Sequence, residues 1–457
     1  MASPLLDQTV LLDQTIRSLR RTALDRQSTG RVPGLYAAVH RRGELLWGDG
    51  IGVVAVGADR TPGPDDQFLI ASNSKTFTAV MVMQLRDEGR LRLDERISDH
   101  LPEVTHPVTV RQGLAHVSGL QREPIGNVWE TMRQPTTEEL LTGFAEIEQV
   151  GRPHDRWHYS NVVYAVLGEL VARLDGRSWE ESLRARLLDP LELRRTSVGF
   201  DDGSRATGYY VPPYDDVPRP EPVIDLQAMA PCGGMASTAR DLVRWSAFVA
   251  DPDPEVLSPD TMEEMCQPQA LRDAEGWTGA MGLGFFLARS TEGRTWVGHT
   301  GGMPGHITGV FTHRESGTGA LVLMNASVTP APDLFAVALG EHVVTHDPAE
   351  PEPWSPGTEL PAELAGLRGV WFLEGAPFVF SVVRGRLEAR PQSAPATSPP
   401  SVFEQIGEDR YRTVSGRERG ELLLVTRDER GVPVKLSWAT YRATREPLAF
   451  GESPSRL

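Results

Sequence analysis

The stretch Phe68-Leu-Ile-Ala-Ser72-Asn-Ser-Lys75-Thr-Phe-Thr-Ala79 leads from an apolar run into a long helical pattern. If Ser72 opens the helix, its side chain and that of Lys75, three positions later, lie on one face of the first turn. Free backbone N–H groups at such a helix start can point at an anion. A serine with an amine beside it and an oxyanion site in its own backbone is the S-x-x-K arrangement of serine acyl enzymes. We therefore predict that Ser72 is a nucleophile.

The choice of lysine strengthens this prediction. Among 46 lysines and arginines, only Lys75 and Lys435 are lysines. A guanidinium does not give up its proton at working pH, whereas a desolvated ammonium does. A lysine one turn after a serine therefore indicates a chemical role. The alternative is that Ser72 caps the helix and Lys75 is a solvated surface charge.

Composition excludes several classes of function. The 457 residues carry a net charge of −16, which argues against nucleic acid or an anionic membrane surface as a partner. The two cysteines, Cys232 and Cys266, form neither a disulfide framework nor a zinc motif, so we predict no metal and no cofactor. No run of 18 apolar residues occurs, and the first residues have no basic segment with a long apolar core. We expect a cytoplasmic protein without a membrane segment.

Residues 1–346 read as one α+β domain. Strands are expected early, at 35–40, 44–47 and 51–56, and again late in the domain. The late strands are expected at 282–289, 295–298, 307–312 and 319–325. Helical patterns lie at 5–27 and 332–346 and between the two groups, at 72–88, 108–116, 137–147, 162–174, 179–188 and 238–249. Helices inserted between two groups of antiparallel strands predict a single sheet with a helical subdomain.

A different pattern follows. Prolines and acids crowd residues 347–361, as in an interdomain linker. Residues 362–457 then show seven short strand patterns with glycine turns, interrupted by a low-complexity loop at 391–400. This pattern predicts a small antiparallel β-barrel.

Three further stretches complete a resemblance. They are Tyr159-Ser-Asn161, His299-Thr-Gly-Gly302 and Cys232-Gly-Gly-Met-Ala-Ser-Thr238, with His116-Val-Ser-Gly-Leu120 as an additional landmark. With S-x-x-K, the motifs Y-x-N and H-T-G-G come in the order and at the separations of the serine β-lactamase-like family. At these residues the chain resembles class C β-lactamases, family VIII esterases, D-aminopeptidases and low-molecular-weight penicillin-binding proteins, over roughly residues 30–345. The resemblance implies a β-lactamase/transpeptidase-like fold for this part of the chain.

The resemblance also implies roles for the motif residues. Ser72 would attack a carbonyl and form an acyl enzyme, while Lys75 and Tyr159 share the proton as a coupled pair, either one being the base. Asn161 would hold a substrate amide. The N–H groups of Ser72 and Gly302 would form the oxyanion hole. His299 stands where many relatives carry lysine, which lessens the positive charge available for a β-lactam carboxylate.

Each of these residues also has a structural interpretation. Tyr159 can be a core aromatic residue, Asn161 an N-cap for a helix that starts at Val162, and His299 a residue that satisfies a strand end. Their joint occurrence in family order favours a catalytic site.

Two kinds of acyl transfer fit. An S-x-x-K domain followed by a lipocalin-like barrel is similar to stand-alone penicillin-binding-protein-type thioesterases, which is taken to imply release and cyclisation of a nonribosomal peptide from a peptidyl carrier protein. In that resemblance, the barrel supplies an arginine that faces the active site, and Arg442 stands at a comparable position, where it would bind a carboxylate. Arg442 can equally be a solvated charge at a strand end. The alternative function is a carboxylesterase or D-aminopeptidase-like hydrolase. The substrate would be a peptidyl thioester or an ester.

Overall fold

The computed structural model describes residues 11–328, 331–351, 353–357, 359–395, 397–416, 418–449 and 451–452. The chain divides into two compact units, Met1–Glu350 and Pro351–Leu457. The division falls inside the stretch predicted as a linker, residues 347–361. Parts of three predicted segments lie outside the described residues: positions 5–10 of the first helix, 352 and 358 of the linker, and 396 of the low-complexity loop.

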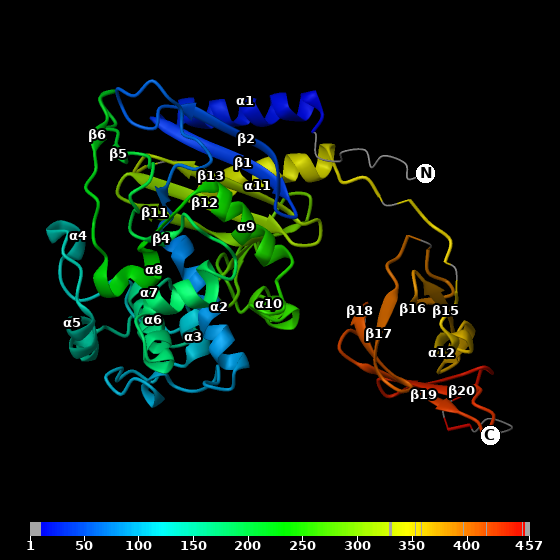
Figure 1. Ribbon diagram of the computed structural model, residues 1–457. Helices are drawn as coiled ribbons and strands as arrows, with labels where there is room; N and C mark the ends of the chain where they lie inside the picture. Colours follow the sequence, from blue (N-terminus) through cyan, green and yellow to red (C-terminus); the bar gives the residue numbers. More distant parts are fainter. Residues whose placement is uncertain are drawn as a thin grey trace. The chain divides into compact units, whose positions relative to one another are not determined.

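An antiparallel sheet of eight strands forms the centre of the first unit, in the order β2-β1-β13-β12-β11-β10-β9-β8 (Figure 1). The early strand β1 pairs with the last strand, β13, with Leu35 opposite Met324. The predicted meeting of early and late strands in one sheet is therefore confirmed. The strands are β1 (Gly34–Arg41), β2 (Glu44–Gly52), β8 (Ala270–Leu271), β9 (Gly279–Met281), β10 (Phe286–Arg289), β11 (Thr295–Met303), β12 (His306–His313) and β13 (Thr318–Met324).

The two faces of the sheet carry separate hydrophobic cores. Leu35, Ala37 and Val39 of β1 pack with helices α1 (Asp13–Thr29) and α11 (Pro332–His346), which lie on one face (Figure 1). Tyr36 and Ala38 belong to the core on the opposite face. Side chains of a strand alternate between faces, so one buried strand serves both layers.

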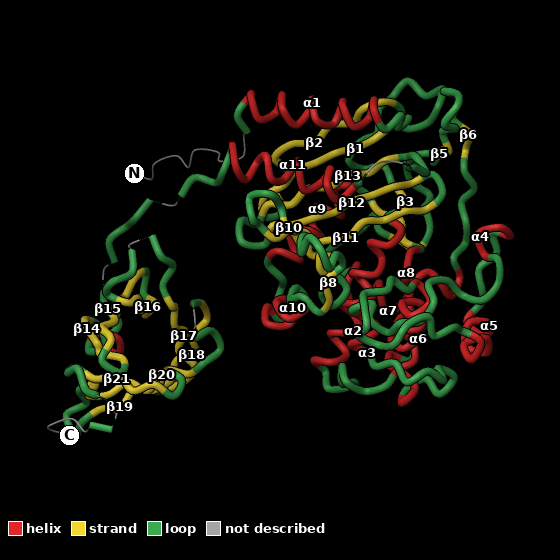
Figure 2. Tube along the Cα trace, turned by 180° about the vertical axis from the view of Figure 1, so that it is seen from behind, coloured by secondary structure: helices red, strands yellow, loops and turns green. Residues whose placement is uncertain are grey.

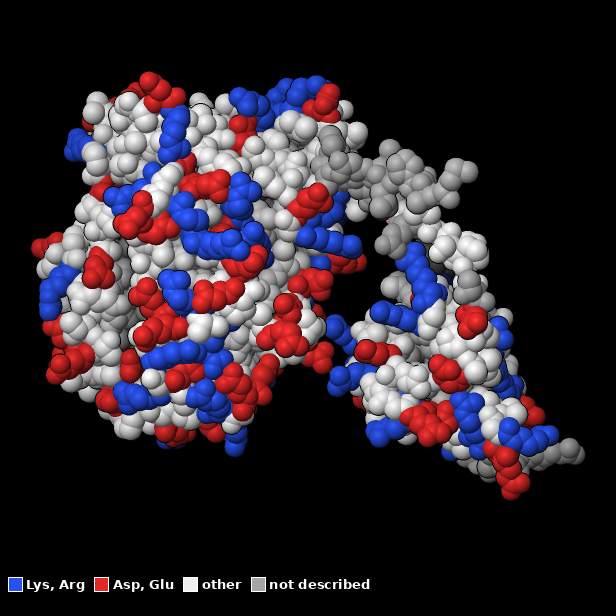
Figure 3. All heavy atoms as spheres, viewed as in Figure 1, with Lys and Arg blue, Asp and Glu red and all other residues white. Residues whose placement is uncertain are grey.

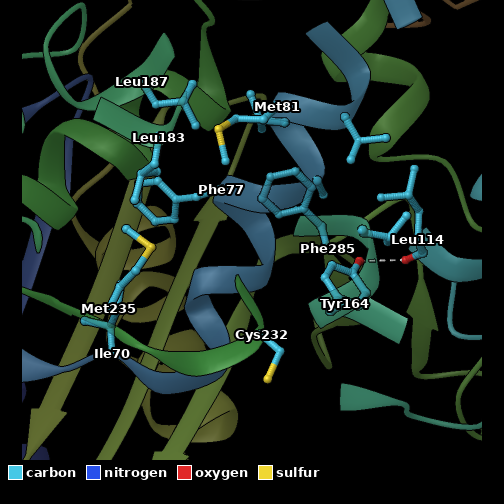
Figure 4. Close-up of a cluster of buried hydrophobic side chains, with 14 of the residues drawn as sticks. Ile70, Phe77, Met81, Leu114, Tyr164, Leu183, Leu187, Cys232, Met235 and Phe285 are labelled. Carbon is cyan, nitrogen blue, oxygen red and sulfur yellow. Dashed lines mark hydrogen bonds between the residues drawn. The ribbon is translucent and has the colours of Figure 1, made fainter. Parts of the chain in front are cut away.

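Helix α2 (Ser74–Asp87) lies at the centre of the helical subdomain. Its residues from Ser74 to Leu85 are all buried, as expected for a helix enclosed on every side. Phe77 and Met81 pack in a buried cluster that also contains Leu183 (Figure 4). Because it is packed all round, α2 holds the residues at its N-terminus in a fixed position.

Other helices surround α2 and the sheet. They include α3 (Val110–Leu114), α4 (Val128–Thr131), α5 (Thr137–Thr142), α6 (Asn161–Asp175), α7 (Trp179–Leu183), α8 (Ala230–Gly233), α9 (Ala239–Ala250) and α10 (Pro259–Met265). Helix α9 packs on β12 and β13, on the face opposite to α11. The hydroxyl of Tyr164 in α6 donates to the carbonyl of Leu114 in α3 at 2.8 Å (Figure 4).

Two predicted strands differ from the structure. Residues 51–56 are not a third strand, because β2 continues to Gly52 and Gly52 then turns the chain with a φ of +76°. The predicted strand 282–289 is shorter, since Gly284 adopts a φ of +94° in the turn between β9 and β10. A Cβ on Gly284 would lie 2.2 Å from the Cβ of Ala79 in α2, so this turn needs glycine for conformation and for space.

The second unit is a closed antiparallel barrel of eight strands (Figure 2). They are β14 (Gly369–Leu373), β15 (Ala376–Val383), β16 (Arg386–Pro391), β17 (Ser401–Gly407), β18 (Arg410–Ser415), β19 (Leu422–Arg427), β20 (Pro433–Trp438) and β21 (Tyr441–Thr444). The barrel predicted from the sequence is confirmed, and β21 is the strand that the pattern missed. A short helix, α12 (Ala362–Ala365), precedes β14. Trp371, Phe380, Phe403 and Trp438 are among the residues that fill the barrel.

No helix within the described part of the chain is both long and apolar enough to span a bilayer.

Two buried histidines make the stability of the first unit sensitive to acid. Burial lowers the pKa of His40 from 6.5 to about 4 and that of His306 to about 3. Below pH 6.5 the unfolded chain protonates both, while the folded chain does not, so folding loses stability as the pH falls. Each histidine contributes about 1.4 kcal/mol of loss per pH unit between 6.5 and its folded pKa. We expect the free energy of unfolding, measured with denaturant, to decline steadily from pH 6.5 to 4.5; a constant value would contradict this account.

Candidate active site

Ser72 lies in a short 3-10 turn, Ala71–Asn73, immediately before α2. Helix α2 therefore begins at Ser74, two residues later than predicted, because the N–H of Asn73 and the hydroxyl of Ser74 bond back to the carbonyls of Ile70 and Ala71. Ala71 has a φ of +48°, which is uncommon for a residue other than glycine. This sharp turn carries the chain from the short strand β3 (Phe68–Leu69) into the helix at Ser72.

Lys75 lies in the first turn of α2, with its side chain fully buried. Its Nζ donates to Ser72 Oγ at 3.2 Å, to Asn161 Oδ1 at 2.8 Å and to the carbonyl oxygen of Cys232 at 2.6 Å. The contact with Ser72 is the amine–hydroxyl pair that the spacing predicts, and the alternative of a solvated lysine is wrong. Three acceptors match the three hydrogens of an ammonium.

Tyr159 lies beside this pair, with its ring centre 4.7 Å from Lys75 Nζ. The ring of His116 stacks on it with 4.2 Å between ring centres, and the guanidinium carbon of Arg122 lies 5.0 Å from its centre. The Tyr159 hydroxyl has no hydrogen-bond partner within the described part of the chain. A phenol whose ring lies near two cations and whose hydroxyl is unengaged is suited to exchange a proton with a neighbouring group.

Asn161 is the first residue of α6, and the N-cap of that helix is Ser160, whose hydroxyl accepts from the N–H of Val163. The capping role considered for Asn161 is therefore wrong. The Asn161 amide instead bridges two charged groups, since its Oδ1 accepts from Lys75 and its Nδ2 donates to Glu123 Oε1 at 2.7 Å. One continuous row of hydrogen bonds thus links Ser72, Lys75, Asn161 and Glu123.

His299 lies on β11 and is buried. Burial and the nearby charge of Lys75 hold its pKa well below 6.5, so the ring is neutral. Its Nδ1 bonds to the carbonyl oxygen of Thr300 at 2.5 Å, and this contact requires a proton on Nδ1 because a carbonyl only accepts. Its ring centre lies 6.1 Å from that of Tyr159. The site therefore has no positive charge at position 299.

Strand β11 runs unusually close to the nucleophile turn. A Cβ on Gly301 would lie 2.1 Å from the carbonyl oxygen of Ile70, so only glycine permits this approach. The amide of Asn73 donates to Ile70 O at 3.1 Å and to Thr308 Oγ1 at 2.9 Å, which ties the turn to β12. This packing brings Gly302 of β11 to the cavity that Ser72 also lines, where their two N–H groups are the predicted oxyanion donors.

Ser72 opens into a cavity of about 340 Å³. Its apolar wall includes Trp129, Leu226, Met229 and Met303. Its polar lining includes Arg122, Glu123, Gln134 and Asn161. The Nε2 of Gln134 is buried without a hydrogen-bond partner in the described structure. A donor left unpaired in a substrate-sized cavity is a suitable contact for a substrate carbonyl.

The sequence did not single out Glu123, Arg122 or Gln134. All three belong to the segment that follows the landmark ending at Leu120. Their nearness to that landmark in the sequence was the one indication that they could lie at the site. Their place in the cavity depends on how this segment folds across the start of α6, where the N–H of Asn161 donates to Arg122 O at 2.7 Å.

Arg442 belongs to the second unit, on β21. Its guanidinium donates to the carbonyl oxygens of Ala449, at 3.1 Å, and Glu452. Its backbone N–H donates to Glu374 Oε1 at 3.1 Å. The side chain is therefore engaged within its own unit through contacts that lie at the surface, which agrees with the strand-end charge considered from the sequence.

Metal-binding side chains do not gather in the described residues, where no group of three or more histidines, cysteines or acids could hold an ion.

A buried lysine that donates to a serine hydroxyl, in this fold of one sheet with a helical subdomain, is typical of the serine hydrolases that use an S-x-x-K motif. The family model described as "Beta-lactamase" matches residues 12–342, and the chain belongs to this family. A second model, a domain of unknown function named DUF7586, matches residues 360–445.

Individual relatives agree with this assignment. Penicillin-binding protein 4 of Amycolatopsis lactamdurans is 29% identical over 372 residues, which cover 75% of this chain and 94% of that protein. The D-amino acid amidase of Ochrobactrum anthropi SV3, solved with L-phenylalanine amide, is 25% identical with a TM-score of 0.59 over 72% of this chain and 96% of that one. The match to the octameric penicillin-binding protein homologue of Pyrococcus abyssi covers 95% of this chain and 100% of that one, at 22% identity and a TM-score of 0.64. This match shows a similarity of fold alone.

Proposed function

We propose that this serine hydrolase is a penicillin-binding-protein-type thioesterase, which releases a nonribosomal peptide from its carrier protein and cyclises it through an acyl enzyme on Ser72. The observation that carries the proposal is the hydrogen-bonded row from Ser72 through Lys75 and Asn161 to Glu123. It places a carboxylate in the cavity that holds the nucleophile. Glu123 Oε1 also accepts from Arg122 Nε at 3.3 Å, and a carboxylate at this place can in addition accept from the amine at the start of a peptide, which is the nucleophile that cyclisation requires.

The proposed reaction has two steps. Ser72 Oγ attacks the thioester carbonyl, its proton passes to the base, and the carrier thiol leaves as the C–S bond breaks and the proton is returned to sulfur. The peptide amine then attacks the Ser72 ester, an amide bond forms, and Ser72 leaves with a proton from the amine. The N–H groups of Ser72 and Gly302 stabilise the oxyanion in both steps.

Lys75 and Tyr159 share the work of the base in this proposal. Lys75 Nζ lies within hydrogen-bond distance of Ser72 Oγ, at 3.2 Å. The ring of Tyr159 lies 4.7 Å from Nζ, so the two groups act as one pair in which either can take the Ser72 proton.

A second candidate function is hydrolysis by the same acyl enzyme, as in a D-aminopeptidase-like hydrolase or a carboxylesterase. The similarity to the D-amino acid amidase favours it. The carboxylate of Glu123 would then hold the α-ammonium of the substrate rather than an attacking amine. The two functions share the first step and differ in the group that attacks the Ser72 ester.

Peptidyl thioesters with a leaving group that mimics the carrier arm distinguish the two. The purified chain is incubated with one peptide in two forms, with a free or an acetylated N-terminus, and the products are separated by mass spectrometry. A cyclic product from the free form, with linear acid alone from the acetylated form, supports the cyclase. Linear acid alone from a series of free peptides of different lengths excludes it and leaves the hydrolase.

Arg442 is proposed to bind a carboxylate of the peptide substrate, in exchange for its present contacts with backbone carbonyls. We expect Arg442→Ala to lower kcat/KM for the peptidyl thioester about tenfold and to leave that for a small ester unchanged. Arg410→Ala, on strand β18 of the same barrel, is the matched control, because Arg410 is exposed. Equal loss on both substrates would count against the role of Arg442.

The charge of the surface bears on the carrier protein as partner. Figure 3 shows basic and acidic side chains interspersed on the face of the first unit in view. Carrier proteins are commonly acidic, so the net charge of −16 repels them at long range, and this observation weighs against the carrier as partner.

A further inference from the structure

Arg272 is a half-buried cation near the catalytic residues, and none of the roles described so far uses it. It follows β8, and its backbone N–H donates to Gly279 O at 2.8 Å. Its guanidinium carbon lies 3.7 Å from the ring centre of Phe286 and 5.2 Å from that of Trp157. Its Nε is buried without a partner among the described residues. Aromatic faces thus hold this charge, a geometry in which a cation is attracted by the ring quadrupole.

Phe286 connects this cation to the site. The ring of His299 stacks on Phe286 with 3.9 Å between centres and 20° between planes. Two groups this close to one ring occupy its opposite faces, so Phe286 lies between Arg272 and His299. The ring centre of Tyr159 lies 6.2 Å from that of Phe286 and 6.0 Å from that of Trp157. Both rings that contact Arg272 therefore also border Tyr159.

Tyr159 needs positive charge around it if its phenolate takes the Ser72 proton. The titratable or charged side chains that face it from the elements packed around it are Lys75, Arg122, His116, His299, Tyr164 and Arg272. Burial lowers the pKa of both His116 and His299 well below 6.5, so neither is a cation. Lys75 is buried and Arg272 is half-buried, whereas the Arg122 side chain is 62% exposed and pairs with Glu123 at 3.3 Å.

We propose that Arg272 is a positioning residue for the acylation step, whose fixed positive charge, held on Phe286, stabilises negative charge on Tyr159. It supplies the charge that the neutral His299 does not. Asp333 and Asp273 act on Arg272 from a distance, and no ion pair with a described residue neutralises it. The inference rests on the proposed use of Tyr159 as a base.

The test compares Arg272→Met, which keeps an apolar chain on Phe286 without the charge, with Arg272→Lys, which keeps the charge. Arg289→Met is the matched control, because Arg289 is exposed on β10.

The readout is the pH dependence of kcat/KM for a chromogenic ester. Removing the cation destabilises negative charge at the site, so the acid limb in Arg272→Met is expected to move up by about one pH unit. Activity should return to nearly the unsubstituted value above that limb. Arg272→Lys and Arg289→Met should keep the original limb.

A purely structural role for Arg272 gives a different result. The kcat/KM of Arg272→Met would then fall by the same factor at every pH, or the acid limb of its pH profile would stay in place. Either outcome overturns the inference. Tyr159→Phe separates this failure from that of the proposed base, because it should lower kcat/KM by about 10²-fold or more. If Tyr159→Phe is nearly as active as the unsubstituted enzyme, the base assignment is wrong. If it is impaired and the limb of Arg272→Met stays in place, only the role of Arg272 is wrong.

Discussion

Replacing Lys75 with arginine is expected to lower kcat/KM by about 10³-fold, within the range that a positioned acid–base group contributes. The buried Nζ makes three short contacts, to Ser72, Asn161 and the carbonyl of Cys232. A guanidinium is planar and larger, and it neither fits this arrangement nor gives up its proton. The measurement is the rate of ester hydrolysis under conditions where the variant remains folded.

The chain offers an unusually clean control for this substitution. Lys435, on β20 of the barrel, is the one other lysine in the sequence. Lys435→Arg makes the same chemical change outside the site and should keep full activity toward a small ester. If Lys75→Arg retained more than a tenth of the activity, the amine would not be a proton-transfer group.

The substitution Gly301→Ala is expected to have the second largest effect. The added Cβ would lie 2.1 Å from the carbonyl oxygen of Ile70 and 2.6 Å from Thr308 Oγ1. Both atoms belong to the packing that fixes the nucleophile turn against the sheet, and a backbone carbonyl cannot turn aside as a side chain does. We expect a loss of about 3 kcal/mol in the free energy of unfolding and at least a 10²-fold loss of kcat/KM in the variant that folds.

Gly302→Ala is the comparison for this prediction. A Cβ on Gly302 meets only the end of the Ile307 side chain, at 3.3 Å, and the backbone N–H is retained. The cost to stability should therefore be below about 1 kcal/mol. Equal destabilisation by the two substitutions, measured by denaturant unfolding, would show that the close approach of β11 to Ile70 is not what holds the turn.

The sequence was most informative where chemistry depends on local spacing. Ser72 and Lys75 are one turn apart, so a helical pattern was enough to predict their contact. Tyr159, Asn161 and His299 come from distant segments, and only the resemblance to a family placed them together. The two-domain layout was also predictable, since a change from helical to short-strand periodicity follows the proline-rich stretch.

Other features depend on tertiary structure and leave no periodic signal. Strand β8 has two residues, and Arg272 gains its place only because that strand joins the sheet edge. Strand β21, with four residues, is defined by closure of the barrel against β14. The role of Glu123 arises from a contact with Asn161, 38 positions away. A pattern within a short window cannot show these contacts.

Covalent labelling with a fluorophosphonate probe tests the central claim most directly. The intact protein is treated with the probe, digested, and the modified residue located by mass spectrometry. The account predicts one rapidly formed adduct, on Ser72, that is absent in Ser72→Ala and at least 10²-fold slower in Lys75→Arg than in Lys435→Arg. An unlabelled Ser72, or labelling at the same rate in both lysine variants, would contradict a nucleophile activated by its neighbouring amine.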